Sequence, residues 1–541
     1  MEKWWQQQVV YQIYPRSFQD SNGDGMGDIP GITSRLDYLQ ALGVGVVWLS
    51  PVYASPGDDN GYDISDYCAI DPQFGTMEDM DTLLQEAKAR NIRIVMDLVV
   101  NHTSTSHEWF QKSRRRIPPY TDYYIWQPGK NGKKPNNWTG FFGEDCWVYD
   151  EIRGEYYLHL FAKSQADLNY HDANVIEEVK SVMRFWLDKG VSGFRCDVIN
   201  VLYKDSLASS RKRLILTGRE HYLTLPGTHA ILHELRRDVL SGYDCFTVGE
   251  TCFVTPKEGR DLCEPERGEL DMIFNFEHME TDQYFVKWFH RKFSPRRLGE
   301  ALARWQTALT WSAVYLENHD QPRSVSRFGD DGRFHDESAK MLCTLLLSLR
   351  GTPYIYQGQE LGMTNFDYTS MDQLDDVESK NIDRLLKRLG FPAAVRWRKM
   401  RHSSRDNART PMQWTDAPNA GFTTPDAAPW LGVNANHARI NAQAQMADER
   451  SVWHYYKEML AFRAASPVLR KGDFTLLAAT DALFAFSRSY AGERMIVLCS
   501  FCKEAQTVPY RGEICIDSYA KSTFDGVLQP YEAVILKEGE A

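Results

Sequence analysis

The sequence has no long hydrophobic run and no excess of positive charge. Its longest apolar stretch, residues 341–349, is far too short to cross a bilayer. The first residues contain no apolar segment of the secretory type. The formal net charge of −11 leaves no basic surplus of the kind that nucleic acids or anionic membranes require. These absences predict a protein that binds neither nucleic acid nor membrane.

Cysteine is present but forms no cluster with histidine at the spacing of a zinc site. The 10 cysteines are scattered along the chain. This usage favours free thiols in a reducing compartment, so a cytoplasmic location is expected. No organic cofactor is predicted, and we expect a monomer or a weak homo-oligomer that acts on a small molecule.

What the chain does have is a regular alternation of buried strands and helices. At 541 residues it is long enough for a barrel of about 250 residues with additions. Eight apolar segments, each followed by a helical pattern, read as strands at 9–17, 44–51, 92–100, 192–198, 245–250, 270–276, 312–320 and 353–357. This alternation predicts an α/β fold, a parallel (β/α)8 TIM barrel.

The alternation is interrupted once and then replaced. Residues 103–171 are rich in Trp, Tyr, Asn, Pro and Gly and contain no comparable strand–helix unit, so they are predicted to form a small lobe inserted after strand 3. From residue 467 to 541 the pattern becomes short alternating runs between turn residues, which predicts a C-terminal antiparallel β-sandwich. The barrel would then comprise residues 1–102 and 172–466.

Charged residues stand at the ends of several predicted strands. They are Asp97 and His102, Arg195 and Asp197, Glu250, and the segment from Glu317 to Asp320. Each alone could be a helix cap or a structural ion pair. The carboxyl ends of barrel strands converge at one mouth, however, and several carboxylates there suit acid–base and nucleophilic work on a neutral, hydroxyl-rich substrate. Glycoside cleavage is a reaction that needs such a pair of carboxyl groups.

A Gly/Asp-rich loop follows the first strand. Oxygen donors recur there at every second position, namely Asp20, Asn22, Asp24, the Met26 carbonyl and Asp28. This spacing is typical of a loop wrapped around a hard cation, and it predicts a structural calcium ion. The alternative is a connecting loop that solvates its own turns.

Four segments resemble the signature regions of the α-amylase family of glycoside hydrolases (glycoside hydrolase family 13). They are residues 97–102, 193–200, 247–250 and 317–323. Residues 59–63, 165–169 and 405–414 resemble the oligo-1,6-glucosidase branch, which includes isomaltases, other α-glucosidases, sucrose isomerases and trehalose-6-phosphate hydrolases. The resemblance extends over nearly the whole chain.

The resemblance implies a role for each matching residue. Asp197 would be the nucleophile, Glu250 the general acid and then base, and Asp320 the stabiliser of the transition state, with net retention. The residues that the resemblance places around the substrate are Asp59, Tyr62, His102, Phe161, Arg195, Val198, His319 and Arg405. Arg195 is expected to keep Asp197 ionised. Asp59 and Arg405 would close the pocket around the non-reducing end, and Asp63 would be structural.

Val198 carries the prediction of linkage. Within the resembled branch, valine after the nucleophile accompanies preference for α-1,6 bonds. The sequence therefore predicts an exo-acting retaining α-glucosidase that releases glucose from isomaltose, panose and isomalto-oligosaccharides. Ala166 and the basic run 209–214 leave trehalose-6-phosphate hydrolase as an alternative. A broad α-1,4/α-1,6/sucrose specificity is another, and a binding subunit without catalysis is disfavoured because all three acids are present.

Overall fold

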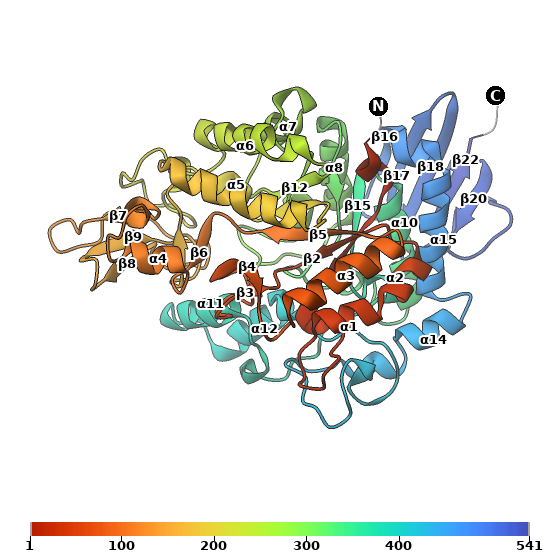
Figure 1. Ribbon diagram of the computed structural model, residues 1–541. Helices are drawn as coiled ribbons and strands as arrows, with labels where there is room; N and C mark the ends of the chain where they lie inside the picture. The colour runs from red at the N-terminus through yellow and green to blue at the C-terminus, as the bar shows by residue number, and fades with distance from the viewer. Residues whose placement is uncertain (1–2, 539–541) are drawn as a thin grey trace.

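The structure, a computed structural model, describes residues 3–538. Eight strands lie in the order β13-β12-β11-β5-β2-β1-β15-β14, and neighbouring strands are parallel. They are β1 (Val10–Ile13), β2 (Val46–Leu49), β5 (Arg93–Leu98), β11 (Gly193–Cys196), β12 (Phe246–Glu250), β13 (Met272–Phe274), β14 (Ala313–Val314) and β15 (Thr352–Tyr356). The end strands β13 and β14 also contact each other. The predicted TIM barrel is therefore confirmed (Figure 1).

Helices surround this barrel and connect successive strands. They are α1 (Ile29–Ser34), α2 (Leu36–Leu42), α3 (Met77–Ala89), α5 (Ala173–Asp188), α6 (Pro226–Asp238), α7 (Pro256–Cys263), α8 (Pro295–Ala308), α9 (Ser324–Phe328), α10 (His335–Ser348) and α15 (Val452–Ala465). Local signals fix their starts: Thr76 and Asp79 form a capping box before α3, and the Asp172 carboxylate caps α5. α5 then buries an apolar stripe that includes Met183 and Trp186.

A separate lobe stands between β5 and α5, at the left of Figure 1. It contains α4 (Glu108–Ser113) and the antiparallel strands β7 (Trp126–Gln127), β9 (Glu155–Leu158) and β8 (Trp147–Asp150). At its base β6 (His102–Ser104) pairs with β10 (Gln165–Asp167), and His102 lies opposite Asp167. A buried cluster joins Trp138 and Leu158 of the lobe to Val198 and Val201 beyond β11. The lobe therefore packs directly over the carboxyl end of the barrel.

Four helices between β15 and α15 lie where the sequence pattern predicts none. α11 (Val377–Arg388) and α12 (Ala393–Ser403) follow β15, and α13 (Asp406–Arg409) and α14 (Ala442–Ala447) come later in the same excursion. The sequence of α11 and α12 is mostly polar, which weakens the apolar periodicity that marks a core helix. α11 still begins with a strong signal, because the Asp376 carboxylate accepts the N–H groups of Glu378 and Ser379.

The C-terminal part is antiparallel, as predicted. Its five-stranded sheet has the order β16 (Asp473–Ala479), β17 (Leu483–Tyr490), β18 (Glu493–Ser500), β22 (Ala533–Lys537) and β20 (Glu513–Asp517). A second ribbon, β19 (Gln506–Thr507) with β21 (Val527–Leu528), packs Val508 and Leu528 onto this sheet. α16 (Pro467–Lys471) joins it to the barrel. Residues 539–541 of the predicted domain lie outside the described residues, and the exact domain limits stay predictions.

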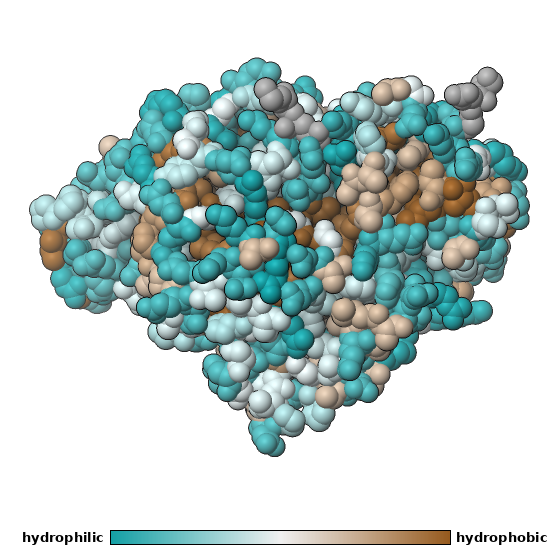
Figure 2. Space-filling model, turned by 45° about the vertical axis from the view of Figure 1, so that its right-hand side comes forward, coloured by the Kyte–Doolittle hydropathy of each residue, from teal (hydrophilic) through white to brown (hydrophobic). Residues whose placement is uncertain are grey.

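The helix lengths, the visible surface and the cysteines give three further observations. Among residues 3–538 no helix has both the length and the apolar character of a membrane span. The face in Figure 2 is mainly hydrophilic, with hydrophobic side chains gathered in a band across its middle. All 10 cysteines are free, including the pair with Cys-x-x-Cys spacing, Cys499 and Cys502; the first of these is buried in β18. Its burial raises the pKa of the Cys499 thiol above its ordinary value.

Candidate active site

One guanidinium binds three carboxylates at the carboxyl end of the barrel. Arg195 Nη1 lies 2.7 Å from Asp97 Oδ1 and 2.6 Å from Asp197 Oδ1, and its Nη2 lies 2.6 Å from Glu250 Oε2. These residues come from the adjacent strands β5, β11 and β12 and the turn after β11, and Asp97 stands opposite Arg195 in the parallel register. All four are buried. The cluster therefore has one positive charge for three acids.

Burial of the three acids and the repulsion between their negative charges favour the protonated form of each acid. Burial raises the pKa of Glu250 to about 8 against the opposing charge of Arg195. Burial, opposed in the same way by the charge of Arg195, raises the pKa of Asp197 to about 7 and that of Asp97 to about 6. A hydrogen bond with the Glu250 side chain lowers the pKa of Asp197. Arg195 thus opposes protonation of Asp197, as expected, but burial outweighs it, and Glu250 is the acid most ready to hold a proton.

The backbone after Asp197 is strained. Val198 has φ of 35°, in the left-handed region that a β-branched residue rarely adopts. In this conformation its N–H donates to Glu250 Oε2 at 3.2 Å. The strained peptide therefore helps to fix the Glu250 carboxyl group beside Asp197, while the Val198 side chain lines the adjoining cavity.

Asp320 has the opposite environment. Its Oδ1 accepts from Arg409 Nη2 at 2.6 Å and lies 3.5 Å from Arg405 Nη1. Burial favours the neutral acid, but the charges of Arg405 and Arg409 help to hold the pKa of Asp320 well below its usual range. Asp320 is therefore an ionised carboxylate close to Glu250, an acid that readily keeps its proton.

A second charged network closes one end of the site. Arg405 Nη2 lies 3.0 Å from Asp59 Oδ1 and 2.7 Å from Asp376 Oδ1. Gln165 Nε2 donates to Asp59 Oδ2 at 3.3 Å and contacts His102 Nε2 at 3.1 Å. Asp59 and Arg405 are thus held in a fixed geometry by groups from the lobe and from the segment beyond β15.

Aromatic and imidazole rings form the floor of the site. Tyr62 and His319 lie parallel, with 5° between their planes and centroids 5.4 Å apart, and Tyr62 Oη is 2.8 Å from His319 Nε2. Burial lowers the pKa of His319 to about 3 and also lowers the pKa of His102. Both imidazoles are neutral and can hydrogen-bond hydroxyl groups. Phe161 packs against His102 with ring centroids 5.1 Å apart.

These groups enclose a cavity of about 200 Å³. The predicted residues that line it are Asp59, Tyr62, His102, Phe161, Asp197, Val198, Glu250, Asp320 and Arg405. Arg195 and His319 lie directly behind this lining, through their contacts with Asp197 and Tyr62. The structure therefore brings together side chains spread over more than 340 positions of sequence. Asp63 does not line it; it accepts from the N–H groups of Asp58 and Asp59, as a structural residue would.

Several contributors were not assigned a role from the sequence. They are Asp97, Gln165, Lys287, Asp376, Glu378 and Arg409. Asp97, Gln165 and Arg409 stand inside the quoted segments, so their positions could have suggested them. Asp376 caps the N-terminus of α11, Glu378 lies in its first turn and Lys287 lies in a long loop, and no motif marks them.

Comparison with known proteins decides the family. The family described as "Alpha amylase, catalytic domain" matches residues 12–472. The chain belongs to the α-amylase family. It is 48% identical to an oligo-1,6-glucosidase of Parageobacillus thermoglucosidasius, over 99% of both chains. A trehalose-6-phosphate hydrolase of Bacillus licheniformis aligns with a TM-score of 0.94 and 41% identity over 99% of this chain and 100% of that one.

An isomaltulose synthase of Klebsiella sp. LX3 aligns with a TM-score of 0.96 and 39% identity, covering 99% of both chains. Within the α-amylase family, the chain is therefore a glycoside hydrolase of the α-glucosidase group that acts on a carbohydrate. Because relatives of similar identity carry different activities, the exact substrate has to be argued from the site.

The loop predicted to bind calcium contains only oxygen donors. Asp20 Oδ1 accepts the N–H groups of Asn22 at 3.0 Å and Gly23 at 2.7 Å, and Asp28 Oδ1 accepts that of Gly31 at 2.6 Å. Within residues 3–538 no three His, Cys, Asp or Glu side chains gather as a metal-holding group. The predicted set also uses an amide and a carbonyl, donors that suit a hard cation. Calcium binding stays a prediction.

Proposed function

We propose that this protein is an exo-acting retaining α-glucosidase that removes glucose from the non-reducing end of short α-1,6-linked gluco-oligosaccharides. Isomaltose, panose and isomalto-oligosaccharides are its substrates. The observation that carries the proposal is the shared guanidinium of Arg195, which holds Asp197 and Glu250 on two adjacent nitrogen atoms, each at 2.6 Å.

This pairing supports retention. Retaining glycosidases place their two carboxyl groups about 5–5.5 Å apart, whereas inverting ones leave room for a water molecule at about 6.5–9.5 Å. Asp197 and Glu250 share one guanidinium and also hydrogen-bond each other. Two carboxyl groups bound to one guanidinium favour the short separation of a retaining pair, so in this proposal Asp197 itself attacks the sugar.

In the first step Asp197 Oδ bonds to the anomeric carbon as the glycosidic C–O bond breaks. Glu250 gives its proton to the departing oxygen, which leaves as an alcohol. The raised pKa of Glu250, about 8, means that this acid is protonated at neutral pH. Hydrogen bonds from Arg195 and from Glu250 favour the charged form of Asp197 for the attack.

In the second step water replaces Asp197. Glu250, now a carboxylate, takes a proton from the water as its oxygen bonds to the anomeric carbon and the ester bond to Asp197 breaks. Glucose leaves with its original configuration. Asp320, kept ionised by Arg405 and Arg409, stabilises the positive charge that develops on the sugar in both steps.

The closed end of the cavity supports exo action. Asp59 and Arg405 form an ion pair of 3.0 Å across the end that would hold the non-reducing hydroxyl groups. Arg405 is also bonded to Asp376, so the pair has little freedom to open. One glucose unit fits before this wall, and a longer chain extends only toward the leaving-group side.

The preference for α-1,6 bonds rests on Val198 and on similarity. Val198 lines the cavity beside Asp197 and Glu250 with a branched apolar side chain that offers no hydrogen bond to the leaving group. The relative of 48% identity is named an oligo-1,6-glucosidase. Both observations favour an α-1,6-linked substrate.

Trehalose-6-phosphate hydrolysis is the second candidate, because Arg213 lines the cavity next to the glucose pocket. Arg211, Lys212 and Arg213 are all exposed there, and clustered cations suit a phosphorylated sugar. A trehalose-6-phosphate hydrolase of Bacillus subtilis is 42% identical over 99% of this chain. Arg213 is, however, paired with Glu220 at 3.4 Å, which reduces its availability.

A substrate panel tests these proposals. Purified protein is assayed with isomaltose, panose, maltose, sucrose and trehalose 6-phosphate. We expect the highest kcat/KM with isomaltose and panose. A dominant rate with the phosphorylated sugar would replace the first proposal by the second, and equal efficiency with maltose and isomaltose would refute the linkage preference. Calcium in the 20–28 loop, a cytoplasmic location and a monomer or weak homo-oligomer are further predictions.

A further inference from the structure

A second, larger cavity opens beside the glucose pocket. Its volume is about 660 Å³. The two cavities share the lining residues Phe141, Phe276, Lys287, Gln321 and Glu378. The residues assigned to the non-reducing end line only the smaller cavity. The larger one therefore lies on the side where the leaving group emerges.

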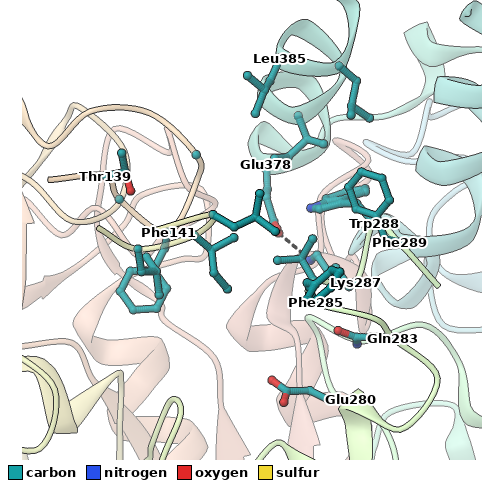
Figure 3. A pocket seen from close by; sticks show the side chains of 18 of the residues that line it. Thr139, Phe141, Glu280, Gln283, Phe285, Lys287, Trp288, Phe289, Glu378 and Leu385 are labelled. Carbon is teal, nitrogen blue, oxygen red and sulfur yellow. Dashed lines mark hydrogen bonds and ion pairs between the residues drawn. The ribbon is translucent and has the colours of Figure 1, made fainter. Parts of the chain in front are cut away.

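Its walls come from six separate parts of the chain. They are residues 139–143 of the lobe, 213–216 after β11, Phe253 after β12, 276–289 after β13, Gln321 after β14, and α11 with the residues just beyond it. In Figure 3 Thr139 and Phe141 stand on one side, Trp288 and Phe289 on the other, and Leu385 closes the space above. The cavity is an extended recess rather than a surface dimple.

Hydrophobic side chains are exposed in this recess. Twelve large hydrophobic side chains are exposed among residues 3–538, and five of them line this cavity. Those five are Leu214, Phe253, Phe285, Phe289 and Leu389. Leu214 is 81% exposed, Phe285 70% and Leu389 65%. Exposed hydrophobic side chains that lie together in one place mark a binding surface, whereas single exposed hydrophobic side chains are normal on any protein.

Several of the polar groups in the recess are already paired. Lys287 Nζ lies 2.6 Å from Glu378 Oε2, and Arg327 Nη1 donates to Gln321 Oε1 at 2.8 Å. Glu280 also lines the recess, and its side chain is exposed. Hydroxyl groups entering the recess would leave water and find few free partners, which costs free energy. An apolar group carries no such cost.

We propose that this recess receives the aglycone and that the enzyme hydrolyses α-glucosides whose aglycone is an extended apolar group, such as an alkyl chain. The inference rests on the proposed α-glucosidase activity. Asp197 bonds to the anomeric carbon, the bond from that carbon to the alkoxy oxygen breaks, and Glu250 protonates the oxygen, so an alcohol leaves. Water then releases glucose and restores both acids.

A series of alkyl α-glucosides tests this inference. Methyl, butyl, hexyl and octyl α-D-glucopyranoside are compared below their micelle-forming concentrations. Each buried methylene contributes about 0.8 kcal/mol, so we expect kcat/KM to rise by about two- to fourfold per methylene. A flat series with normal isomaltose hydrolysis would overturn the inference and leave the proposed function standing.

A binding measurement tests the aglycone site independently of the proposed α-glucosidase activity. Calorimetric titration of the Asp197→Asn variant with the same glucosides needs no turnover. A Kd that decreases with chain length supports the aglycone site even if isomaltose is not hydrolysed. A Kd independent of chain length contradicts it.

Matched variants locate the site. Phe285→Ser and Leu389→Gln change exposed side chains, so their fold should persist, and each should flatten the chain-length dependence while leaving the methyl glucoside unaffected. Leu476→Gln, in β16 and 40% exposed, is the control and should change nothing. One result would overturn the inference: kcat/KM is independent of chain length, the wild type is a dimer, and Phe285→Ser dissociates it. The recess would then be assigned to contact with a second copy of the chain.

Discussion

Arg195 Nη2 lies 2.6 Å from Glu250 Oε2, although Glu250 is the carboxyl group that must carry a proton for catalysis. Arg195 therefore stabilises the charged form of the acid as well as the charged form of Asp197. Burial and the charges of Asp197 and Asp320 outweigh it at Glu250 and raise the pKa of that group to about 8. The acid thus stays protonated at neutral pH but can ionise after it has given its proton away.

The first prediction is an alkaline limb in the pH profile. Above pH 8 Glu250 loses its proton, so kcat/KM for isomaltose should fall by about tenfold per pH unit. On the acid side the rate should fall as Asp197 takes up a proton near pH 7. Because the carboxyls are coupled, both limbs belong to the cluster. A profile that is flat from pH 7 to 10 contradicts this assignment.

The second prediction concerns stability. The pKa of Glu250 is raised from its ordinary 4.5 to about 8, so the folded chain binds this proton more tightly than the unfolded chain does. Its contribution to stability is full below pH 4.5 and is lost as pH rises to 8. The Tm of Glu250→Gln minus that of the wild type should therefore increase over this window. A constant difference would show that Glu250 titrates normally.

The third prediction tests the grip on the non-reducing end. Asp59→Asn removes the charge that pairs with Arg405, and a hydrogen bond to a charged group contributes about 1.5–3 kcal/mol. KM for isomaltose should rise by about tenfold or more. Asp58→Asn is the control, since Asp58 is exposed one residue away and should leave KM unchanged. Equal effects from the two variants would remove Asp59 from the substrate site.

The fourth prediction tests Val198. Val198→Thr keeps the branched shape and adds a hydroxyl group beside Asp197 and Glu250. The ratio of kcat/KM for maltose to that for isomaltose should increase by roughly tenfold, within the range that one polar group can supply. Thermal unfolding checks that the fold is intact. If the ratio does not move, linkage preference is set elsewhere in the cavity.

The fifth prediction is that calcium stabilises the 20–28 loop. Chelation should lower the Tm, and calcium but not magnesium should restore it, because the loop offers many flexible oxygen donors. Metal analysis of the purified protein gives the stoichiometry. An identical Tm with chelator and with calcium would refute a structural ion there.

The barrel could be predicted because each strand is short, apolar and bounded by turns. The convergence of Asp197, Glu250 and Asp320 followed from the topology, since Glu250 ends β12 and the other two follow β11 and β14. The order of the pKa values in the Arg195 cluster could not be predicted. It depends on how closely the Arg195 guanidinium approaches each of the three acids that it contacts.

Other parts of the site left no sequence signal. Asp376 and Glu378 reach Arg405 from the N-terminal end of α11, a helix that was not predicted because its sequence is mostly polar. The strained φ of Val198 is a property of the turn after β11 and is invisible in residue types. The apolar recess is assembled from six separate parts of the chain, and only their packing shows that Phe285 and Leu389 face one space.

The most direct test of the central claim is the configuration of the first glucose released from isomaltose, followed by proton NMR before mutarotation. We expect α-glucose to form first, because Asp197 attacks the sugar and water later enters from the original side. Initial release of β-glucose would contradict the covalent role of Asp197 and the retaining mechanism.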